Sequence, residues 1–254
     1  SKSETASRLR GRIESILDWC RVQGFRAGDN PARWKGHLDK LLPKPSKVAK
    51  VENHPALPWQ QAGAFMQALR QRQGEAARAL EFAILTAARS GEVRGAAWAE
   101  IDFDAGVWHV PGERMKASKP HDVPLSAAAL RVLQAVQADG MEGLIFKGRH
   151  GAALSDMSLL AVIRRMNAPD PIWTDRTGKP ALVHGFRSTF RVWAAEATNH
   201  PREVAEHALA HRLPDAVEAA YMRSTLFEKR RVLMADWAAH CDTVQAPADV
   251  VPIR

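Results

Sequence analysis

The sequence predicts a mainly α-helical protein with a small antiparallel β-sheet, in two parts that divide near residue 50. Long stretches carry apolar residues at helical spacing, whereas only short runs show the alternation of a strand. A segment rich in proline and lysine, 43–50, separates a basic first part from a second part that has enough apolar residues for its own core. We therefore expect an α+β protein with a helical segment at 1–50 and a larger domain at 51–254.

The first part is expected to hold one long helix and one short helix. Residues 5–24 place an apolar stripe on one face and arginines around the rest, and Gly24 is typical of a helix end. A shorter helix is expected at about 31–42. Because one helix and a half cannot enclose a core, we expect this part to be the end of a domain whose beginning is missing from the chain. The apolar stripe consists of Leu9, Ile13, Ile16 and Leu17.

The second part is expected to be helical apart from a hairpin and one further strand. The hairpin strands are expected at 107–110 and 121–125, on either side of a polar segment, and the further strand near 144–146. Prolines and glycines predict a long loop at 167–181. The expected helices cover 57–73, 75–88, 126–138, 155–166, 184–198, 201–210, 214–222 and 226–239.

Composition narrows the class of protein. Hydrophobic residues make up 46% and charged residues 25% of the chain, as in an ordinary globular protein. No apolar run approaches the roughly 18 residues that a membrane span needs, and the first residues do not resemble a signal peptide. Cys20 and Cys241 lie near opposite ends of the chain, which argues against a disulfide scaffold or a cysteine zinc site. We therefore expect a cytoplasmic protein without a membrane segment.

The distribution of charge indicates an anionic partner. The net charge is +8, and residues 1–50 contain 12 Lys/Arg against 5 Asp/Glu, whereas the remaining residues contain 24 against 23. A merely solubilising tail would lack the large apolar residues of this stretch, so we expect a folded segment that contacts nucleic acid. The candidate DNA-binding residues are Arg8, Arg10, Arg12, Arg33, Lys35 and Lys47.

Two segments supply candidate arginines for a site. Arg89 ends an alanine-rich helix, and Glu92 can hold its guanidinium in a bidentate pair. His184 and Arg187 share a helix face, and Gly185 between them leaves room for the backbone of a ligand. The start of that helix can also bind an anion through its dipole. Taken alone, Arg89 is more typical of a structural arginine, and a histidine–arginine pair at this spacing is common by chance.

The other candidates are a tyrosine, a histidine and a lysine. Tyr221, ten residues after His211, is the one tyrosine of the chain, so it is the one phenol that could act as a nucleophile. A tyrosine at the end of an alanine-rich helix can equally pack at the edge of a core. Lys116 and Lys119 lie on the polar connection of the hairpin and can reach into a site, although solvated lysines are ordinary there.

These motifs, in this order, resemble the tyrosine recombinase (phage integrase) family, and most closely the integrases of prophages and genomic islands. They are A-R-S-G-E at 88–92, M-K followed by H-D-V-P-L-S, H-G-F-R, and L-A-H followed by the tyrosine. The resemblance covers about 53–240 and, more weakly, 5–50, which is similar to the last helices of that family's core-binding domain. Full-length members begin with an arm-binding domain and earlier core-binding helices, which are missing here.

The resemblance implies a role for each candidate. Arg89 and Arg187 would hold the scissile phosphate, Tyr221 would attack it, and Lys116 would protonate the leaving oxygen. The position of His211 is a tryptophan in some members, which implies hydrogen bonding and packing. Hairpin length varies, so Lys119 stays an alternative acid. The implied catalytic residues are Tyr221, Arg89, Arg187, His184, His211 and Lys116, supported by Glu92.

Phosphodiester cleavage explains why these residue types are needed. Two guanidiniums offset the charge that grows on the non-bridging oxygens, and each such donor is typically worth on the order of 10²–10³ in rate. A phenol with a pKa of about 10 needs a proton acceptor, which His184 can supply. The departing 5′-oxygen needs an acid, hence the lysine. Because these cations cover the charge, we expect no metal or other cofactor.

The resemblance also implies partners. They are double-stranded DNA attachment sites for integration and excision, three further copies of the chain on DNA, and accessory DNA-bending or directionality proteins. The free protein could be a monomer. The helix at 226–239 could pack on its own domain or dock on a neighbouring protomer.

Other functions fit part of the pattern. A DNA-binding regulator explains the basic N-terminal part, but it does not explain the ordered set of arginine, lysine, histidine and tyrosine. A type IB topoisomerase-like enzyme shares the chemistry and differs in relaxing DNA of any sequence. His207 and His211 have the spacing of a helical zinc pair, but the sequence offers neither the glutamate of H-E-x-x-H nor a third ligand.

Overall fold

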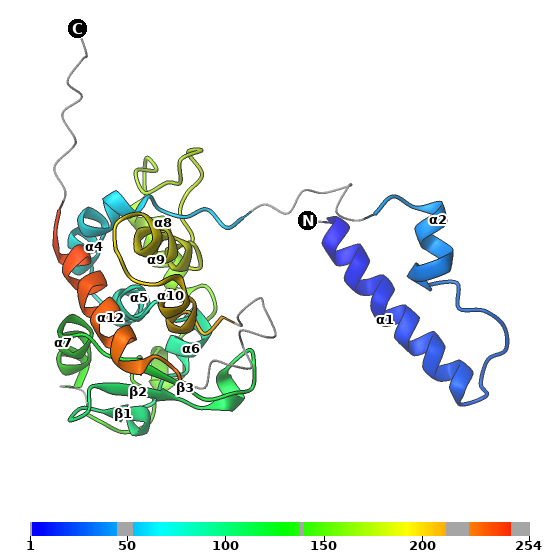
Figure 1. The fold of residues 1–254 in the computed structure, drawn as a ribbon, viewed down its shortest axis with the longest axis horizontal. Helices are drawn as coiled ribbons and strands as arrows, with labels where there is room; N and C mark the ends of the chain where they lie inside the picture. The colour runs from blue at the N-terminus through cyan, green and yellow to red at the C-terminus, as the bar shows by residue number, and fades with distance from the viewer. Residues whose placement is uncertain (1, 45–52, 138–139, 212–223, 245–254) are drawn as a thin grey trace, which may run out of the picture. The chain divides into compact units, whose positions relative to one another are not determined.

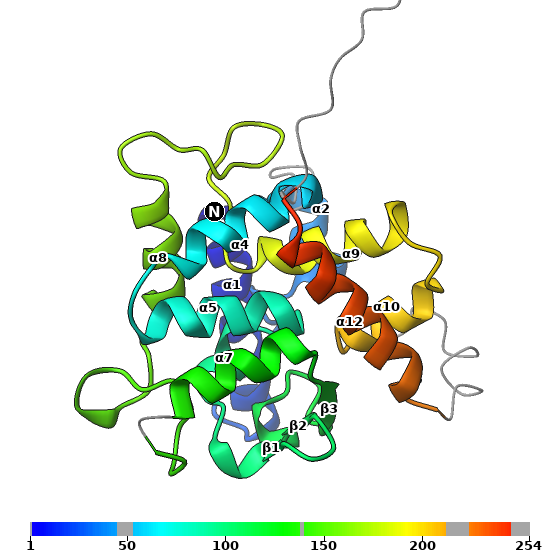
Figure 2. The same cartoon turned by 90° about the vertical axis from the view of Figure 1, so that its left-hand side faces the viewer.

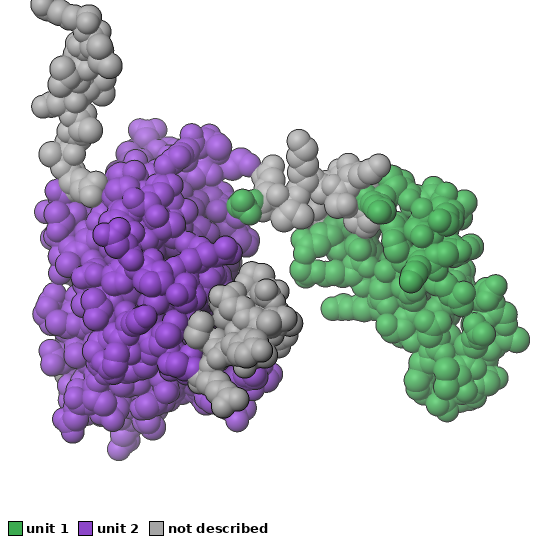
Figure 3. Space-filling model, viewed as in Figure 1, with its two compact units in different colours: residues 1–53 green, residues 54–254 purple. Residues whose placement is uncertain are grey.

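The chain divides into two units, Ser1–Asn53 (unit 1) and His54–Arg254 (unit 2) (Figure 3). The structure, a computed structural model, describes residues 2–44, 53–137, 140–211 and 224–244. Unit 2 is mainly helical with a small antiparallel sheet, which confirms the predicted fold class (Figure 1). The helix expected at 214–222 lies outside the described residues.

Unit 1 consists of the helix α1 (Lys2–Val22) and a return segment tied to it by polar contacts. The buried Asn30 donates to the Glu14 carbonyl and to Asp18, both at 2.8 Å, and accepts from the Ala32 N–H. Leu9, Ile13 and Ile16 lie exposed, so this single helix does not bury its apolar stripe within the unit.

The short helix expected at 31–42 is wrong in extent. The chain instead forms an irregular π-type turn, η1 (Trp34–Leu38), and one short turn, α2 (Asp39–Leu41). Lys35 is extended and Gly36 has a φ of 79°, so neither residue continues a right-handed helix.

Unit 2 is built around the helix α5 (Glu75–Thr86), which is buried along most of its length. Figure 2 shows it between α4 (Ala62–Arg70) and α7 (Ala127–Gln137). Alanine-rich helices allow such close packing because their side chains are small. The other helices are α6 (Ser90–Arg94), α8 (Ser158–Met166), α9 (Gly185–Glu196), α10 (Arg202–Ala208) and α12 (Phe227–Asp242), with short turns η2 (Trp59–Gln61), η3 (Trp98–Glu100), η4 (Gly112–Arg114) and η5 (Arg149–Gly151).

The sheet has the order β1–β2–β3 and is antiparallel. Its strands are β1 (Ile101–Asp102), β2 (Val107–Val110) and β3 (His121–Pro124), and Trp108 of β2 faces Val123 of β3. The predicted hairpin is confirmed, but the strand expected near 144–146 is wrong. Leu144 forms an isolated bridge with Ala97, because this apolar run is buried beside the segment after α6 and not beside the hairpin.

Helix α12 packs on its own domain, which is the first of the two expectations for this segment. Leu233, Met234 and Trp237 are buried, and the Trp237 indole N–H donates to the Ile84 carbonyl of α5 at 2.8 Å. Arg230 is 1% exposed and donates to the Thr225 and Asp122 carbonyls, which ties α12 to β3. Within the described ranges, no helix combines the length and apolar character needed to cross a membrane.

Candidate active site

Arg89 lies just after α5, at the start of α6. Helix α5 ends at Thr86, Ala87 takes a left-handed conformation, and Arg89 is the N-cap of α6. Its guanidinium donates to Oε1 of Glu92 at 2.7 Å, and its backbone N–H donates to Oε2 at 2.8 Å. Glu92 therefore orients Arg89, although through one guanidinium bond and one backbone bond, not through the bidentate pair that we expected.

Arg187 joins three segments of unit 2. From α9 it donates to the Ala87 carbonyl before α6 and to the Leu209 carbonyl after α10, the latter at 2.6 Å. Its Nη2 lies 3.3 Å from Nε2 of His211. Arg187 is 6% exposed, and its buried Nε has no hydrogen-bond partner among the described residues.

The charge of Arg187 is incompletely balanced. Burial and the positive charge of Arg89 lower the pKa of Arg187 to about 10, against the opposing effect of Glu92. The side chain stays protonated at neutral pH, so a buried cation beside a second cation needs a further anion. With an unpaired N–H in addition, this arrangement is suited to bind an oxyanion such as a phosphate.

His184 precedes the first residue of α9. Partial burial and the charges of Arg187, His54, Arg89 and His211 lower its pKa, so the imidazole is neutral at pH 7 and can accept a proton. The rings of His54 and His184 meet edge to face, with centroids 4.8 Å apart. Sequence reasoning missed His54, because only the fold brings it beside His184.

Gly185 has a role different from the one expected. A Cβ at this position would lie 2.0 Å from the Pro55 carbonyl oxygen, which also accepts the Leu182 N–H at 3.1 Å. The space at Gly185 therefore admits the chain's own backbone and not that of a ligand. The packed segment is the one that carries His54.

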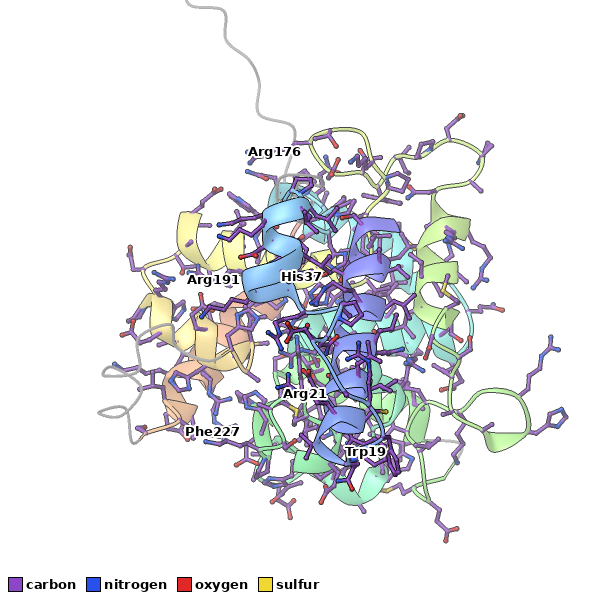
Figure 4. The ribbon with its side chains drawn as sticks, turned by 90° about the vertical axis from the view of Figure 1, so that its right-hand side faces the viewer. Trp19, Arg21, His37, Arg176, Arg191 and Phe227 are labelled. Carbon is purple, nitrogen blue, oxygen red and sulfur yellow. The ribbon has the colours of Figure 1, made fainter. Side chains whose placement is uncertain are left out.

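His211 is held by a carboxylate that sequence reasoning also missed. Nδ1 of His211 lies 2.8 Å from Glu206 on α10, and the other Glu206 oxygen accepts from Nε of Arg191 on α9 at 2.7 Å. Figure 4 labels Arg191. Burial alone would raise the pKa of Glu206, but the bonds from Arg191 and His211 lower it. A carboxylate can only accept, so Nδ1 carries the proton and Nε2 faces Arg187.

The remaining candidate residues are either exposed or lie outside the described residues. Lys116 and Lys119 are both exposed on the β2–β3 connection. Tyr221 and Lys47 lie outside the described residues. No group of three or more potential side-chain metal ligands occurs within the described part of the chain. The structure thus brings together Arg89, Arg187, His184 and His211.

The candidate DNA-binding residues of unit 1 are engaged to different degrees. Arg10 pairs with Glu14, donates to the Ala32 carbonyl at 2.7 Å and lies over the Trp34 ring, so it holds unit 1 together. Arg8 forms an exposed pair with Glu4, and Arg33 lies 3.8 Å from Asp29. Arg12 and Lys35 are exposed.

Comparison with known proteins shows that the chain belongs to the phage integrase family. Residues 56–226 match the model of the phage integrase family, and residues 1–37 match the phage integrase central domain. The integrase of Enterobacteria phage P4 is 30% identical over 95% of this chain, and prophage integrase IntA of Escherichia coli is 30% identical over 92%. The chain spans 56% and 54% of the lengths of these two relatives.

Solved structures share the fold. A lambda integrase dimer bound to a COC′ core site has a TM-score of 0.58 and 17% identity, over 84% of this chain and 73% of that one. The Tn1549 transposon integrase in complex with circular intermediate DNA has a TM-score of 0.58 and 16% identity, over 91% of this chain and 78% of that one.

Proposed function

Because the chain belongs to the phage integrase family, we propose that it breaks and rejoins double-stranded DNA at specific sites, with Tyr221 as the nucleophile. The observation that carries this proposal is the convergence of two guanidiniums and two imidazoles on one place in unit 2. A DNA phosphodiester supplies the anion that the buried Arg187 lacks, and its oxygens accept the hydrogen bonds that the two arginines offer.

The arginines act on the phosphate. Attack on phosphorus puts more negative charge on the non-bridging oxygens, and Arg89 and Arg187 are held in place before the substrate arrives. Glu92 and the carbonyls of Ala87 and Leu209 hold them, so little reorganisation is needed during the reaction. His211, whose Nδ1–H is held by Glu206, accepts from Arg187 through Nε2 and so helps to hold that guanidinium in place.

Two protons move in the reaction, one away from the attacking oxygen and one to the leaving oxygen. His184 is neutral at pH 7 and takes the proton of the Tyr221 hydroxyl, whose oxygen then bonds to phosphorus. The bond from phosphorus to the 5′-oxygen breaks, and Lys116 gives that oxygen a proton. The products are a 3′-phosphotyrosyl link and a free 5′-hydroxyl. A different 5′-hydroxyl can reverse the step without ATP, which joins new strands.

Rejoining to a different strand suits integration and excision between attachment sites. A solved lambda integrase structure is a tetramer bound to a Holliday junction, with a TM-score of 0.56 and 18% identity to this chain. We propose that four copies of this chain act together on DNA in the same way, in the bacterial cytosol. Unit 1 would contact the duplex through its basic side chains, whereas Arg10 supports the unit. The proposed contact residues are Arg8, Arg12, Arg33, Lys35 and Lys47.

Covalent capture tests the proposal. The chain is incubated with a pool of labelled duplexes with randomised centres, and DNA that stays attached in denaturing detergent is sequenced. The recovered site is then rebuilt as a nicked duplex, from which the short 5′-hydroxyl strand diffuses away after cleavage. We expect wild type to accumulate adduct on this duplex, and Tyr221→Phe to bind it with similar affinity and give none.

Two outcomes would refute the proposal. Adduct formation by Tyr221→Phe would exclude this tyrosine as the nucleophile. Relaxation of supercoiled plasmids without site preference, with no strand exchange between two copies of the recovered site, would favour the topoisomerase-like alternative.

A further inference from the structure

Arg114 ties the lysine-bearing connection between β2 and β3 to the helix that carries Arg89. It ends the turn η4, two residues before Lys116. Its Nη1 donates to the backbone carbonyl of Glu92 at 2.7 Å, and its Nη2 donates to Oε2 of Glu100. The side chain is 23% exposed, so these bonds are largely shielded from water.

Both partners of Arg114 are themselves fixed. Glu92 is buried and binds two arginines, Arg89 through its carboxylate and Arg114 through its backbone carbonyl. The Oε2 atom of Glu100 also accepts from the indole N–H of Trp108 in β2 at 2.9 Å. Arg114 therefore connects the sheet, α6 and the start of the connection in one hydrogen-bonded frame.

The chain leaves room for this arginine. A Cβ at Gly95 would lie 3.0 Å from Nη1 and 3.3 Å from Cδ of Arg114. The φ of Gly95 is −99°, which any residue adopts, so the absent side chain and not backbone freedom is what this position needs.

The connection beyond Arg114 is folded into successive turns. The Met115 N–H donates to the Gly112 carbonyl at 3.0 Å, and the Ser118 N–H donates to the Met115 carbonyl at 2.9 Å. Met115 is buried, whereas Lys116 is exposed. With Arg114 and Met115 fixed immediately before it, the backbone of Lys116 has a defined place relative to Arg89.

We propose that Arg114 is a positioning residue, which sets the lysine-bearing connection relative to Arg89 so that the lysine reaches the leaving 5′-oxygen. This inference rests on the proposed function. Removal of Arg114 should then weaken protonation of the leaving group more than it weakens binding of the phosphate. A loss of this kind can be separated from a general structural defect by changing the leaving atom.

The test compares cleavage of two nicked duplexes of the captured site. One has the natural 5′-oxygen at the scissile bond, and the other has sulfur there. In both, the tyrosine oxygen bonds to phosphorus and the bond to the 5′ atom breaks, but sulfur departs as a thiolate, which is stable without a proton because thiol pKa values are near 8.5. Loss of general acid catalysis typically slows a reaction by about 10²–10⁴.

We expect Arg114→Ala to cleave the oxygen duplex about 10- to 100-fold more slowly than wild type, as a partial loss of that acid contribution, and the sulfur duplex at close to the wild-type rate. Lys116→Ala should show the same pattern with a larger defect if Lys116 is the acid. Gly95→Ala, which crowds the guanidinium, should show it with a smaller one. Arg114→Lys keeps the charge but not the forked geometry, and should restore little.

Arg94→Ala is the matched control. Arg94 is the last residue of α6, the helix to which Arg114 is bonded through the Glu92 carbonyl. Its side chain is 21% exposed and, like that of Arg114, binds one carbonyl and one carboxylate, those of Leu154 and Asp156. It should cleave both duplexes at the wild-type rate.

An equal slowing of Arg114→Ala on both duplexes would overturn the inference, because it would place the defect at the phosphate or in the fold. If Arg114→Ala unfolds at the assay temperature, the same comparison on Gly95→Ala decides. Absence of a Tyr221 adduct with wild type would instead refute the proposed function, and this inference with it.

Discussion

Glu92→Gln removes one charge from the centre of the proposed site while almost preserving the shape of the side chain. Both oxygens of Glu92 accept hydrogen bonds from Arg89, one from the guanidinium and one from the backbone N–H. Glutamine has one acceptor oxygen, so its NH₂ group must face one of these donors. The substitution also takes away the negative charge that opposes the mutual repulsion of Arg89 and Arg187.

The expected cost follows from these contacts. A hydrogen bond to a charged group contributes about 1.5–3 kcal/mol, and leaving a buried group unsatisfied costs about 1–3 kcal/mol. Arg89 is 23% exposed, so water can offset part of the loss on its side. We expect Glu92→Gln to lower the free energy of unfolding by about 2 kcal/mol. We also expect slower cleavage, because Arg89 is no longer fixed.

Urea unfolding followed by tryptophan fluorescence measures the stability, and adduct formation on the nicked duplex measures the cleavage. Glu113→Gln is the control, since Glu113 is an exposed glutamate at the start of the same β2–β3 connection. A Glu92→Gln protein within about 0.5 kcal/mol of wild type, the range of ordinary surface substitutions, with an unchanged cleavage rate would refute the reasoning.

Three further predictions follow from the described residues. Burial and the charge of Arg230 lower the pKa of His121 to about 4, so between about pH 6.5 and 4 the unfolded chain binds a proton that the folded chain does not. The free energy of unfolding should therefore fall by roughly 3 kcal/mol as the pH drops through this window. In urea melts at a series of pH values, His121→Gln should flatten this dependence, whereas an equally steep dependence would assign the effect to another group. Glu206→Gln should slow adduct formation by about 10-fold without weakening DNA binding, because the amide can donate to Nδ1 and change the tautomer of His211. Glu228→Gln, at an exposed position, is the control. An unchanged rate of adduct formation in Glu206→Gln would show that Glu206 has no part in the reaction. Gly185→Ala should lower the free energy of unfolding by about 3 kcal/mol or more, because the added Cβ would overlap the Pro55 carbonyl. Gly91→Ala is the control, since a Cβ there meets no atom within 4 Å. Equal stability of the two variants would show that the segment at Pro55 moves freely.

The sequence predicted secondary structure best where the pattern of apolar residues within one segment determines it. Apolar spacing predicted α8, α9 and α10 close to their observed bounds, because each of these helices buries one face. The helix α5 and the β2–β3 hairpin were also predicted close to their bounds, although α5 is buried nearly all round. Apolar spacing failed at Ile101–Asp102, because a strand of two residues has no period to detect. It also failed at 144–146, because an apolar run shows burial without showing which backbone it pairs with.

The candidate site follows from the sequence as a set of residues, but the sequence does not predict the contacts among them. The arginines and histidines stand out by order and spacing, but the bonds that hold Arg187 reach Ala87, a hundred residues earlier. Glu206 reaches His211 because the chain turns after α10, with Ala210 in a left-handed conformation. Pairings of this kind depend on tertiary structure, and a single sequence gives no signal for them.

Peptide mapping of the covalent DNA adduct tests the central claim most directly. The adduct from the nicked duplex is digested with protease and nuclease, and the modified peptide is sequenced by mass spectrometry. The account predicts one modified peptide, with a nucleotide 3′-phosphate on the oxygen of Tyr221. A nucleotide on any other side chain, or cleaved DNA that carries no peptide, would contradict it.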